Sequence, residues 1–433
     1  MEPIDTSLER RTRFLTMLML FLVSTFNYVD RTIISILQVP IKQELGLSDT
    51  QIGALTGLAF ALFYTTLSLP IARLADRSNR RNIIVISLVV WSAMTALSGL
   101  ARNYLMLVLF RIGVAAGEAG SVPASHSTIA DYFPAERRAT ALAVWGLSLP
   151  VGLMAGYGIS GILAQHFHWR TVFAIVGGAG IAIAPLVWLL AKEPQRGRYD
   201  PPAVKDGPSP ASVIESLRAL AGKRVLWILM LAAGMHGFTQ YSLMNWTVPF
   251  YVRIHGMSLS QVGLYMGVAS GVGGAIGMFL GGVTADRMGQ RDEKWRVWVV
   301  GLSILGMAIA VSGQLLVSNT DTSLMLGFLG SILMIAYYGP IVAVVQSLVS
   351  ARERAFVGAL LLLVFNIIGL GLGPFMTGAL SDWLATEYGE QSLRWALLCS
   401  LVASTFSGLV FLWIGPVYGR EVRSLTGVVS RAS

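Results

Sequence analysis

The segment from Phe14 to Ile41 is a 28-residue apolar run whose two charged residues, Asp30 and Arg31, are adjacent. As an α-helix it would be ~40 Å long, which exceeds the ~30 Å hydrocarbon core of a bilayer. The two charges would lie ~24 Å from its start, where an ionisable side chain costs ~2.5 to 3.5 kcal/mol on insertion scales. Charges persist at that depth where they pair, face a water-filled cavity or move ions and substrates. The segment therefore predicts a membrane-spanning helix that contains a functional polar site.

The rest of the chain repeats this apolar pattern. Of its 433 residues, 54% are hydrophobic and 13% are charged, a balance that no soluble domain of this length shows. Twelve apolar segments are each long enough to cross a bilayer as a helix. We therefore predict an all-α membrane protein with twelve transmembrane helices. The segments cover residues 14–41, 50–72, 82–101, 104–130, 139–164, 170–191, 225–252, 259–285, 297–317, 322–349, 355–384 and 393–415.

The distribution of Lys and Arg among the loops predicts the orientation of the chain. With alternate loops on one side, 25 of the 32 basic residues fall on the side of the two termini and five fall on the other. Because basic residues concentrate in cytoplasmic loops, both termini are expected in the cytoplasm, and the compact loops suggest a bacterial cell membrane. This topology accounts for the net charge of +9, so no nucleic-acid partner is expected. The two basic residues left over, Arg31 and Arg111, lie inside predicted spans.

The two halves of the chain repeat one another at an offset of 210 residues. Gln-Ile-Gly at 51–53 returns as Gln-Val-Gly at 261–263, and Asp-Arg at 76–77 returns at 286–287. Two six-helix halves are therefore expected. The predicted organisation is an N-terminal bundle over 1–191, a Pro-rich cytoplasmic linker over 192–224 with a short helix near 212–220, a C-terminal bundle over 225–415 and a cytoplasmic tail over 416–433.

The fourth predicted helix carries its own pair of charges, Arg111 and Glu118. Their spacing of seven residues is a rotation of ~700°, so both side chains lie within ~20° of one face. Counted from Tyr104, Arg111 lies ~10 Å and Glu118 ~21 Å into the membrane, which brackets the depth of Asp30 and Arg31.

Two copies of one loop motif identify a family. Residues 72–81 read ARLADRSNRR and residues 282–291 read GVTADRMGQR. Both resemble G-x-x-x-D-R-x-G-R-R, the loop signature of the major facilitator superfamily, and the first copy departs from it at Ala72 and Asn79. The resemblance implies two six-helix bundles that work by alternating access. It also implies a gating role for the charged loop residues Asp76, Arg77, Arg80, Arg81, Asp286, Arg287 and Arg291.

Further runs in the first half are similar to the spinster group of lipid transporters. They include Asn-Tyr-Val-Asp-Arg at 27–31, Gly-Glu-Ala at 117–119, Ile-Ala-Asp-Tyr-Phe at 129–133 and Glu-Pro-Gln-Arg-Gly at 193–197. Symporters of sugar acids and aromatic acids share the first two elements, whereas the last two favour spinster. The resemblance implies an amphipathic anionic lipid substrate, such as a lysophospholipid or a sphingoid phosphate. A small organic or sugar acid taken up with protons is the alternative.

In the superfamily fold, helices 1 and 4 both line the central cavity, so their four charged residues are expected to form two acid–base pairs there. Burial raises the pKa of a carboxyl group and a nearby arginine lowers it, and both effects change as a cavity opens and closes. Asp30 and Glu118 are therefore predicted proton carriers. Arg31 and Arg111 stay charged and suit an anionic headgroup. Structural ion pairs that pin helix 1 to helix 4 are the alternative reading.

Other polar and aromatic residues are weaker candidates for substrate contact, because each also suits ordinary helix packing. His126 and His236 belong to this class, although a histidine satisfied by a neighbouring helix is the commoner case. The further residues predicted to bind substrate are Asn27, Tyr28, Trp145, Phe238, Tyr241 and Asn366.

Several kinds of chemistry are excluded or disfavoured. The chain has no G-x-x-x-x-G-K-[ST] loop and no soluble segment long enough for an ATPase domain, so transport must be driven by a gradient or run downhill. Its single cysteine, Cys399, excludes an intramolecular disulfide and a cysteine metal cluster. We expect no cofactor, no metal site and no enzymatic activity. The expected partners are substrate, protons and membrane lipids, with the chain acting as a monomer. A membrane receptor that binds ligand without transport is a further alternative.

Overall fold

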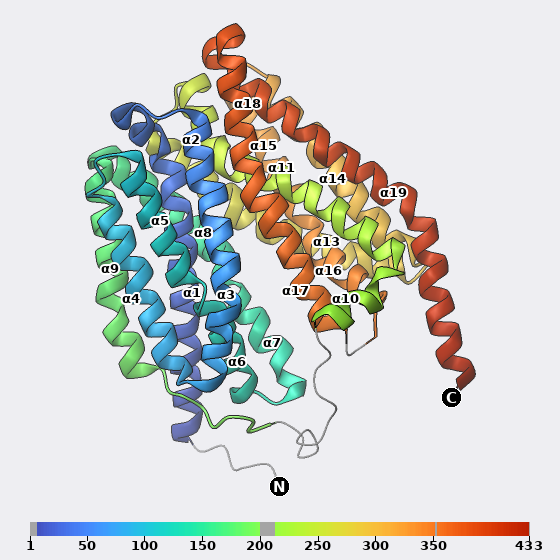
Figure 1. Cartoon of the computed structure of the whole chain (residues 1–433). Coiled ribbons are helices and arrows are strands. Elements are labelled where there is room, and N and C mark those ends of the chain that lie inside the picture. The colour runs from blue at the N-terminus through green and yellow to red at the C-terminus, as the bar shows by residue number, and fades with distance from the viewer. Residues whose placement is uncertain (1–6, 200–212, 351–352, 433) are drawn as a thin grey trace. The chain divides into compact units, whose positions relative to one another are not determined.

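The computed structural model describes residues 7–199, 213–350 and 353–432, and every regular element in these ranges is a helix (Figure 1). They form two compact units. The described residues of 1–47, 59–208 and 258–267 belong to unit 1, and those of 48–58, 209–257 and 268–433 belong to unit 2. Two short segments, 48–58 and 258–267, are thus each assigned to the opposite unit from the chain that flanks them on both sides.

Unit 1 is built mainly from helices of the first half. The contacts between α1 and α8 and between α4 and α9 are the most extensive in this unit. Its main helices are α1 (Ser7–Leu45), α3 (Ala59–Arg77), α4 (Arg80–Ser98), α5 (Tyr104–Glu118), α6 (Ser121–Tyr132), α7 (Ala135–Gly146), α8 (Ser148–His166) and α9 (Trp169–Leu190), and most of α12 (Leu259–Val268) joins them.

Unit 2 contains the helices of the second half together with the short α2 (Asp49–Gly53) and the π-helical turn η1 (Ala54–Leu58). Helix α19 packs along both α11 and α14. The other elements are α10 (Val213–Ala221), α11 (Arg224–His255), η3 (Ala269–Gly273), α13 (Gly274–Gly289), α14 (Lys294–Leu316), α15 (Thr320–Ala336), α16 (Tyr338–Ser347), α17 (Arg354–Val364), η4 (Phe365–Leu372), α18 (Gly373–Tyr388), η5 (Gly389–Gln391) and α19 (Ser392–Ala432).

Ten stretches of the described residues are long and apolar enough to cross a membrane. The last of them, Phe356–Ser424, holds two packed helical stretches, α17–α18 and α19. Helix α11 spans 32 residues but is not among the ten, because it carries buried polar residues such as His236 and Gln240. With α11 added and the last stretch counted as two, the described helices correspond to the twelve predicted spans.

The helix ends differ from the predicted ones by more than a few residues at both ends of the chain. Helix α1 begins at Ser7, whereas the predicted span begins at residue 14. The last helix was expected to end at 415, but α19 continues to Ala432. Pro416 does not end it, because Tyr418 and Val422 beyond the proline are buried in the core of unit 2. Tertiary packing thus outweighs the local signal of the proline.

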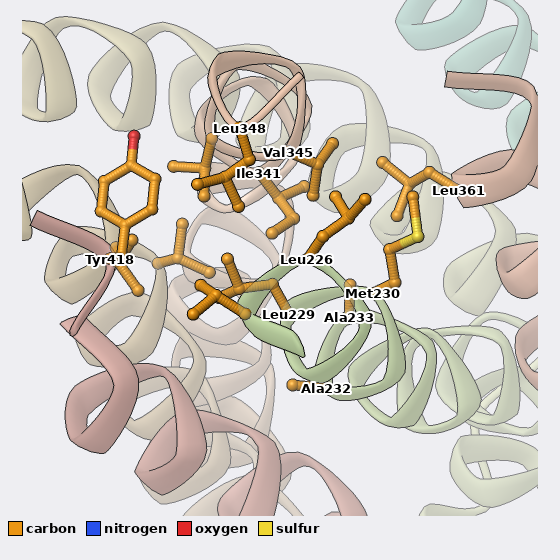
Figure 2. Close-up of a cluster of buried hydrophobic side chains, with 14 of the residues drawn as sticks. Leu226, Leu229, Met230, Ala232, Ala233, Ile341, Val345, Leu348, Leu361 and Tyr418 are labelled. Atoms are coloured by element: carbon orange, nitrogen blue, oxygen red, sulfur yellow. The ribbon is translucent and has the colours of Figure 1, made fainter. Parts of the chain in front are cut away.

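The core of unit 2 gathers side chains from distant parts of the chain (Figure 2). Leu226, Leu229 and Met230 of α11 meet Ile341 and Val345 of α16, and all five are almost fully buried. In a membrane protein such interdigitation stabilises the fold by close van der Waals contact, since lipid tails compete for apolar surface. The cluster holds the two ends of the second half together.

The internal repeat is visible in the capping of two helices. Ser48 caps α2 in a capping box with Gln51. At the offset of 210 residues, the backbone N–H of Ser258 donates to Gln261 and the backbone N–H of Gln261 donates to Ser258 Oγ. The same reciprocal arrangement therefore starts both helices.

Candidate functional site

The four predicted intramembrane charges come together in unit 1. Arg31 Nε donates to Glu118 Oε2 at 2.7 Å, and Arg111 Nη1 lies 3.8 Å from Asp30 Oδ2. Helix α1 supplies one acid and one base, and α5 supplies the other two. The pairs are therefore crossed between the two helices, each acid with a base of the other helix.

The two ion pairs differ in their exposure. The side chain of Arg31 is 25% exposed, whereas that of its partner Glu118 is fully buried. Asp30 and Arg111 are both buried. Buried charges of this kind persist when opposite charges and hydrogen bonds compensate their desolvation. Arg31 is thus the member of the group that a ligand reaches most easily.

A threonine on α4 completes the environment of Asp30. Thr95 is buried, and its hydroxyl donates a hydrogen bond to Asp30 Oδ1. This contact leaves the other oxygen, Oδ2, facing Arg111. The sequence analysis missed Thr95, because a lone threonine in an apolar helix carries no distinguishing signal.

Aromatic rings surround the two arginines. The guanidinium of Arg31 lies 5.1 Å from the ring centre of Phe60, 4.8 Å from that of Tyr64 and 6.0 Å from that of Tyr28. Arg111 lies 5.1 Å from the same Phe60 ring, and Phe60 stacks on Tyr64 at 5.6 Å. Cations over ring faces are stabilised by the ring quadrupole. The site therefore combines fixed positive charge with an apolar, polarisable wall.

Phe60 and Tyr64 of α3 were not among the predicted site residues. Their spacing of four places them on one face of the helix, which was a usable signal. Tyr28 was predicted, and its ring borders Arg31. Asn27, also predicted, is buried one turn before Arg31 on the same helix.

Trp145 lies elsewhere in unit 1, at the end of α7 next to the break at Leu147. Its buried ring meets His126 of α6 edge-on, with the ring centres 4.7 Å apart. No contact with the four charges is recorded among the described residues, so its role in substrate binding stays a prediction.

The predicted residues of the second half lie in unit 2. Tyr241 of α11 is half-buried beside Gly369 of η4, and the half-buried Asn366 belongs to the same π-helical turn. Phe238 is also half-buried on α11, one turn before Ser242, which donates to its carbonyl. Their roles in substrate binding also remain predictions.

His236 has the partners of a structural histidine. Its Nδ1 lies 2.9 Å from Ser404 Oγ and its Nε2 lies 3.4 Å from the carbonyl of Met334. Since a carbonyl only accepts, Nε2 carries the proton and Nδ1 accepts from the serine in the neutral ring. Tyr337 packs edge-on against it and donates to Gln240 at 2.7 Å.

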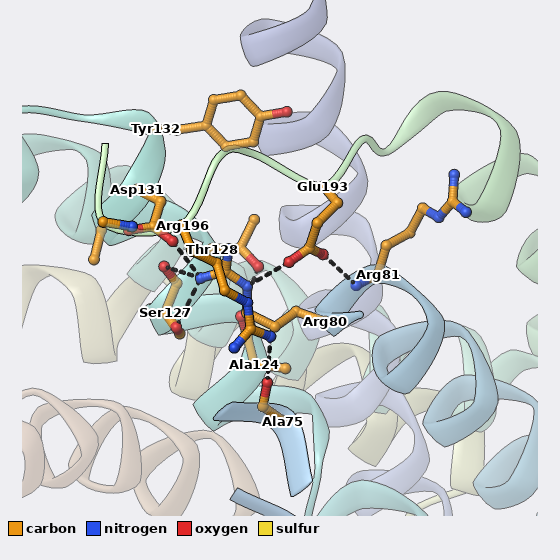
Figure 3. A network of polar contacts seen from close by, with 12 residues as sticks. Ala75, Arg80, Arg81, Ala124, Ser127, Thr128, Asp131, Tyr132, Glu193 and Arg196 are labelled. Carbon is orange, nitrogen blue, oxygen red and sulfur yellow. Dashed lines mark hydrogen bonds and ion pairs between the residues drawn. The ribbon is translucent and has the colours of Figure 1, made fainter. Parts of the chain in front are cut away.

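The predicted gating loop forms a network around Arg80 (Figure 3). Arg80 Nε donates to Glu193 at 2.7 Å, and its Nη1 bonds both Asp131 and Ser127. The arginine side chain is 2% exposed. The backbone N–H of Arg81 also donates to Glu193, at 3.1 Å. The start of α4 is thereby tied to α6 and to the segment after α9.

The runs 129–133 and 193–197, which carried the spinster resemblance, meet in this network. Asp131 Oδ1 accepts from the backbone N–H of Gly197 at 3.1 Å, and Arg196 donates to the carbonyl of Ala75 at 2.9 Å. The sequence indicated the two runs separately, and their shared role around Arg80 follows from the structure (Figure 3).

The remaining gating residues are more exposed. Arg77, Arg287 and Arg291 are exposed, and the side chain of Asp76 lies outside the described side chains. Asp286 is 76% exposed and lies 3.7 Å from Arg296. An exposed pair of this kind adds little stability. Among the predicted gating residues with a described side chain, Arg80 thus has the strongest set of partners.

The described residues contain no group of three or more His, Cys, Asp or Glu side chains arranged to hold a metal ion. The charged side chains of the candidate site instead form pairs of opposite sign.

The sequence matches the family model described as Major Facilitator Superfamily over residues 20–367. It is 35% identical to an MFS-type efflux pump of Mycolicibacterium smegmatis, with 93% of this chain and 92% of that protein covered. It is 26% identical to a probable L-galactonate transporter of Escherichia coli (95% and 92% covered). It is 25% identical to a sphingosine-1-phosphate transporter of Danio rerio (90% and 81% covered).

Among solved structures, the chain is similar to a bacterial homologue of the human lysosomal transporter Spinster, crystallised in an inward-facing and unoccupied conformation. The TM-score is 0.80 at 32% sequence identity, and 95% of this chain and 97% of that chain are covered. These matches confirm the predicted fold class of an all-α, multi-pass membrane protein and the spinster-like resemblance.

Proposed function

This chain belongs to the major facilitator superfamily of transporters, and from that premise we propose that it is a secondary active transporter that couples substrate movement to protons. The observation that supports the coupling is the crossed pairing of Asp30 with Arg111 and of Arg31 with Glu118. Two carboxylates that share one polar site with two arginines can gain or lose protons as the site changes shape. The proposal includes a monomer in the cell membrane with both termini cytoplasmic.

The partial exposure of Arg31 suggests how substrate binding is linked to proton uptake. An anionic group that binds Arg31 displaces Glu118, its partner at 2.7 Å. A buried carboxylate that loses its cation is left uncompensated, so we propose that the site, which holds both Asp30 and Glu118, takes up one proton in compensation. Release of the proton to the other side restores the pair. During the cycle, Arg31 therefore binds Glu118 and the anionic group of the substrate in turn.

We favour an amphipathic anionic lipid, of lysophospholipid or sphingoid phosphate type, as substrate. The rings of Tyr28, Phe60 and Tyr64 around Arg31 suit a ligand whose charged group adjoins apolar chain. The relative from Danio rerio, named as a transporter of sphingosine-1-phosphate, supports this class. So does the similarity to the Spinster homologue.

A small sugar acid is the second candidate. The relative named as a probable L-galactonate transporter supports it, since the chain covers most of that protein. A carboxylate of such an acid would also bind Arg31 in a bidentate manner. The two substrate classes differ in their apolar part, which the lipid has and the sugar acid lacks. The aromatic rings around Arg31 favour the lipid.

A proteoliposome screen distinguishes the two substrate classes. Purified protein is reconstituted, and uptake of labelled lysolipids and of labelled sugar acids is measured with and without a pH gradient. We expect the lysolipid to move and the gradient to increase its accumulation. Movement of the acid alone would establish the second candidate. If neither the lysolipids nor the sugar acids are taken up, and neither class shows counterflow, the transport proposal is contradicted.

Replacing Arg31 with glutamine is expected to weaken substrate binding by about tenfold to a hundredfold, because a charge-assisted hydrogen bond contributes about 1.5–3 kcal/mol. The measurement is the half-saturating concentration for counterflow of the transported ligand. Arg102→Gln, which removes the charge of an exposed arginine, is the control and should leave this concentration unchanged. An unchanged value for Arg31→Gln would remove Arg31 from the binding site.

A further inference from the structure

The segment Ser48–Leu58 connects parts of unit 1 but packs in unit 2. The chain before it, through Leu47, and the chain after it, from Ala59, both belong to unit 1. We call residues 48–58 the first arm. Because the arm is covalently joined to unit 1 at both ends, any movement of one unit against the other must detach the arm or bend the chain at its ends.

The backbone of the first arm approaches α18 and η4 very closely. A Cβ atom on Gly53 would lie 2.3 Å from the carbonyl oxygen of Pro374, and one on Gly57 would lie 2.7 Å from that of Gly371. Gly378 of α18 approaches the carbonyl of Asp49 in the same way. Glycines of this kind permit close helix packing, and here they come from both partners.

A buried ion pair fastens the start of the arm. Both carboxylate oxygens of Asp49 accept from Arg253 in the last turn of α11, each at 2.8 Å. Asp49 Oδ2 also accepts from the hydroxyl of Ser381 at 2.8 Å, and the Asp49 side chain is 3% exposed. A bidentate arginine–carboxylate pair is strong and geometrically specific, and a buried one is costly to break on one side.

A second carboxylate holds the same end of the arm. Asp382 of α18 accepts from the backbone N–H groups of Asp49 and Thr50, at 2.9 and 2.7 Å, and from the hydroxyl of Thr50 at 2.6 Å. These amides belong to the first turn of α2, which lacks intrahelical acceptors for them. Asp382 thus accepts from two backbone N–H groups that the capping box of Ser48 and Gln51 does not satisfy.

The repeated segment in the second half lacks these charges. Residues 258–267 pack in unit 1, where Gly263 meets Gly161 of α8 backbone to backbone. The position that corresponds to Asp49 at the offset of 210 is Leu259, and the segment contains no charged residue. Glycine packing is therefore common to residues 48–58 and 258–267, whereas the ion pair is specific to the first arm.

The first arm ends in a π-helical turn. The turn η1 (Ala54–Leu58) lies directly before the point where the chain returns to unit 1 at Ala59. A second π-helical turn, η3 (Ala269–Gly273), follows the point where the chain leaves unit 1 after Gly267. Such turns interrupt the regular hydrogen-bond ladder, and they occur often at functional sites and at bends.

We propose that Asp49, Arg253 and Asp382 form a latch that holds the first arm in unit 2 during one state of the transport cycle and releases it in another, with η1 as the hinge. The inference rests on the proposed transport function, since only a protein that changes state needs such release. The latch sets how much of the protein occupies the state with the arm docked.

Cysteine labelling tests the latch without any substrate. Cys399→Ser removes the native thiol, and Thr56→Cys places a reporter in the first arm, where Thr56 is buried and its hydroxyl bonds the carbonyl of Ile52 within the arm. The labelling rate with a maleimide is measured on the purified full-length chain. Asp49→Asn and Arg253→Gln are each expected to increase it at least about tenfold, because each breaks the bidentate ion pair and leaves a buried or partly buried charge without its partner.

Two further variants make the test specific. Arg253→Lys keeps the charge but loses the bidentate geometry, so an intermediate rate is expected. Glu44→Gln removes a different ion pair, with Arg170 of α9 in unit 1, and should not change the rate. If Arg253→Gln does not fold, Arg253→Lys decides the outcome. Folded Asp49→Asn or Arg253→Lys protein that labels within twofold of the parent would overturn the proposal.

The outcome is independent of the proposed substrate. A chain that transports neither ligand class but shows the faster labelling would retain the latch and lose the transport proposal. If the protein transports substrate and every latch variant labels at the parental rate, the transport proposal is retained and the latch is rejected.

Discussion

Asp30→Asn is expected to abolish the accumulation of substrate that a pH gradient drives, while leaving exchange intact. One pH unit corresponds to ~1.4 kcal/mol, so coupling to one proton multiplies accumulation by about ten. Asparagine cannot carry that proton, and the accumulation ratio should fall from about ten to about one. Counterflow needs no net proton movement and should continue. The measurement is uptake of the transported ligand into proteoliposomes, with and without the gradient.

The control for this experiment is Thr95→Val. It removes the hydroxyl that donates to Asp30 Oδ1 but keeps the carboxylate, so coupling should survive. Glu118→Gln is measured in parallel, because Glu118 is the other carboxylate of the site. If Asp30→Asn accumulates substrate as well as the parent protein and Glu118→Gln does not, Glu118 is the proton carrier. If both variants accumulate normally, the proton coupling proposed for this site is wrong.

The largest loss of stability is expected for Arg80→Ala, at about 3–5 kcal/mol of unfolding free energy. The substitution leaves Asp131 and Glu193 without the cation that both of them contact, and it removes the donor to Ser127 (Figure 3). The measurement is the thermal unfolding of the purified protein in detergent. We expect a clear decrease in its apparent melting temperature.

Arg81→Ala is the matched control for Arg80→Ala. Arg81 contacts Glu193 through its backbone N–H, which alanine retains, and its side chain is more exposed than that of Arg80. Its effect should stay below about 1 kcal/mol, as is usual for surface positions. Equal effects of the two variants would show that the carboxylates of Asp131 and Glu193 do not depend on the buried arginine.

Much of the candidate site could be predicted from spacing within single helices. The rotation between Arg111 and Glu118 placed them on one face of one helix, and the resemblance to the superfamily placed that helix beside α1. The crossed pairing could not be predicted, because the rotation of α1 about its axis depends on packing. Thr95 of α4 was missed because a lone threonine in an apolar helix carries no signal of its own, whereas Phe60 of α3 had only its spacing from Tyr64 as a signal.

The division of the chain into two compact units could also not be predicted from local sequence. The repeat at 210 residues predicted two equivalent halves, yet residues 48–58 and 258–267 each pack in the other unit. Identical capping boxes start both segments, so local sequence treats them alike. Both segments use glycine packing, and the difference between them is the ion pair of Asp49 with Arg253, which joins residues 204 positions apart.

The sequence by itself determined the membrane class, the twelve spans, the family and the presence of charges within the bilayer. Those properties follow from apolar run length, from the cost of burying a charge and from motif spacing, all of which are local. The tertiary structure decided which acid pairs with which base, which rings surround Arg31 and which unit holds the first arm. These properties depend on how helices distant in sequence rotate and approach one another, and no local pattern encodes that geometry.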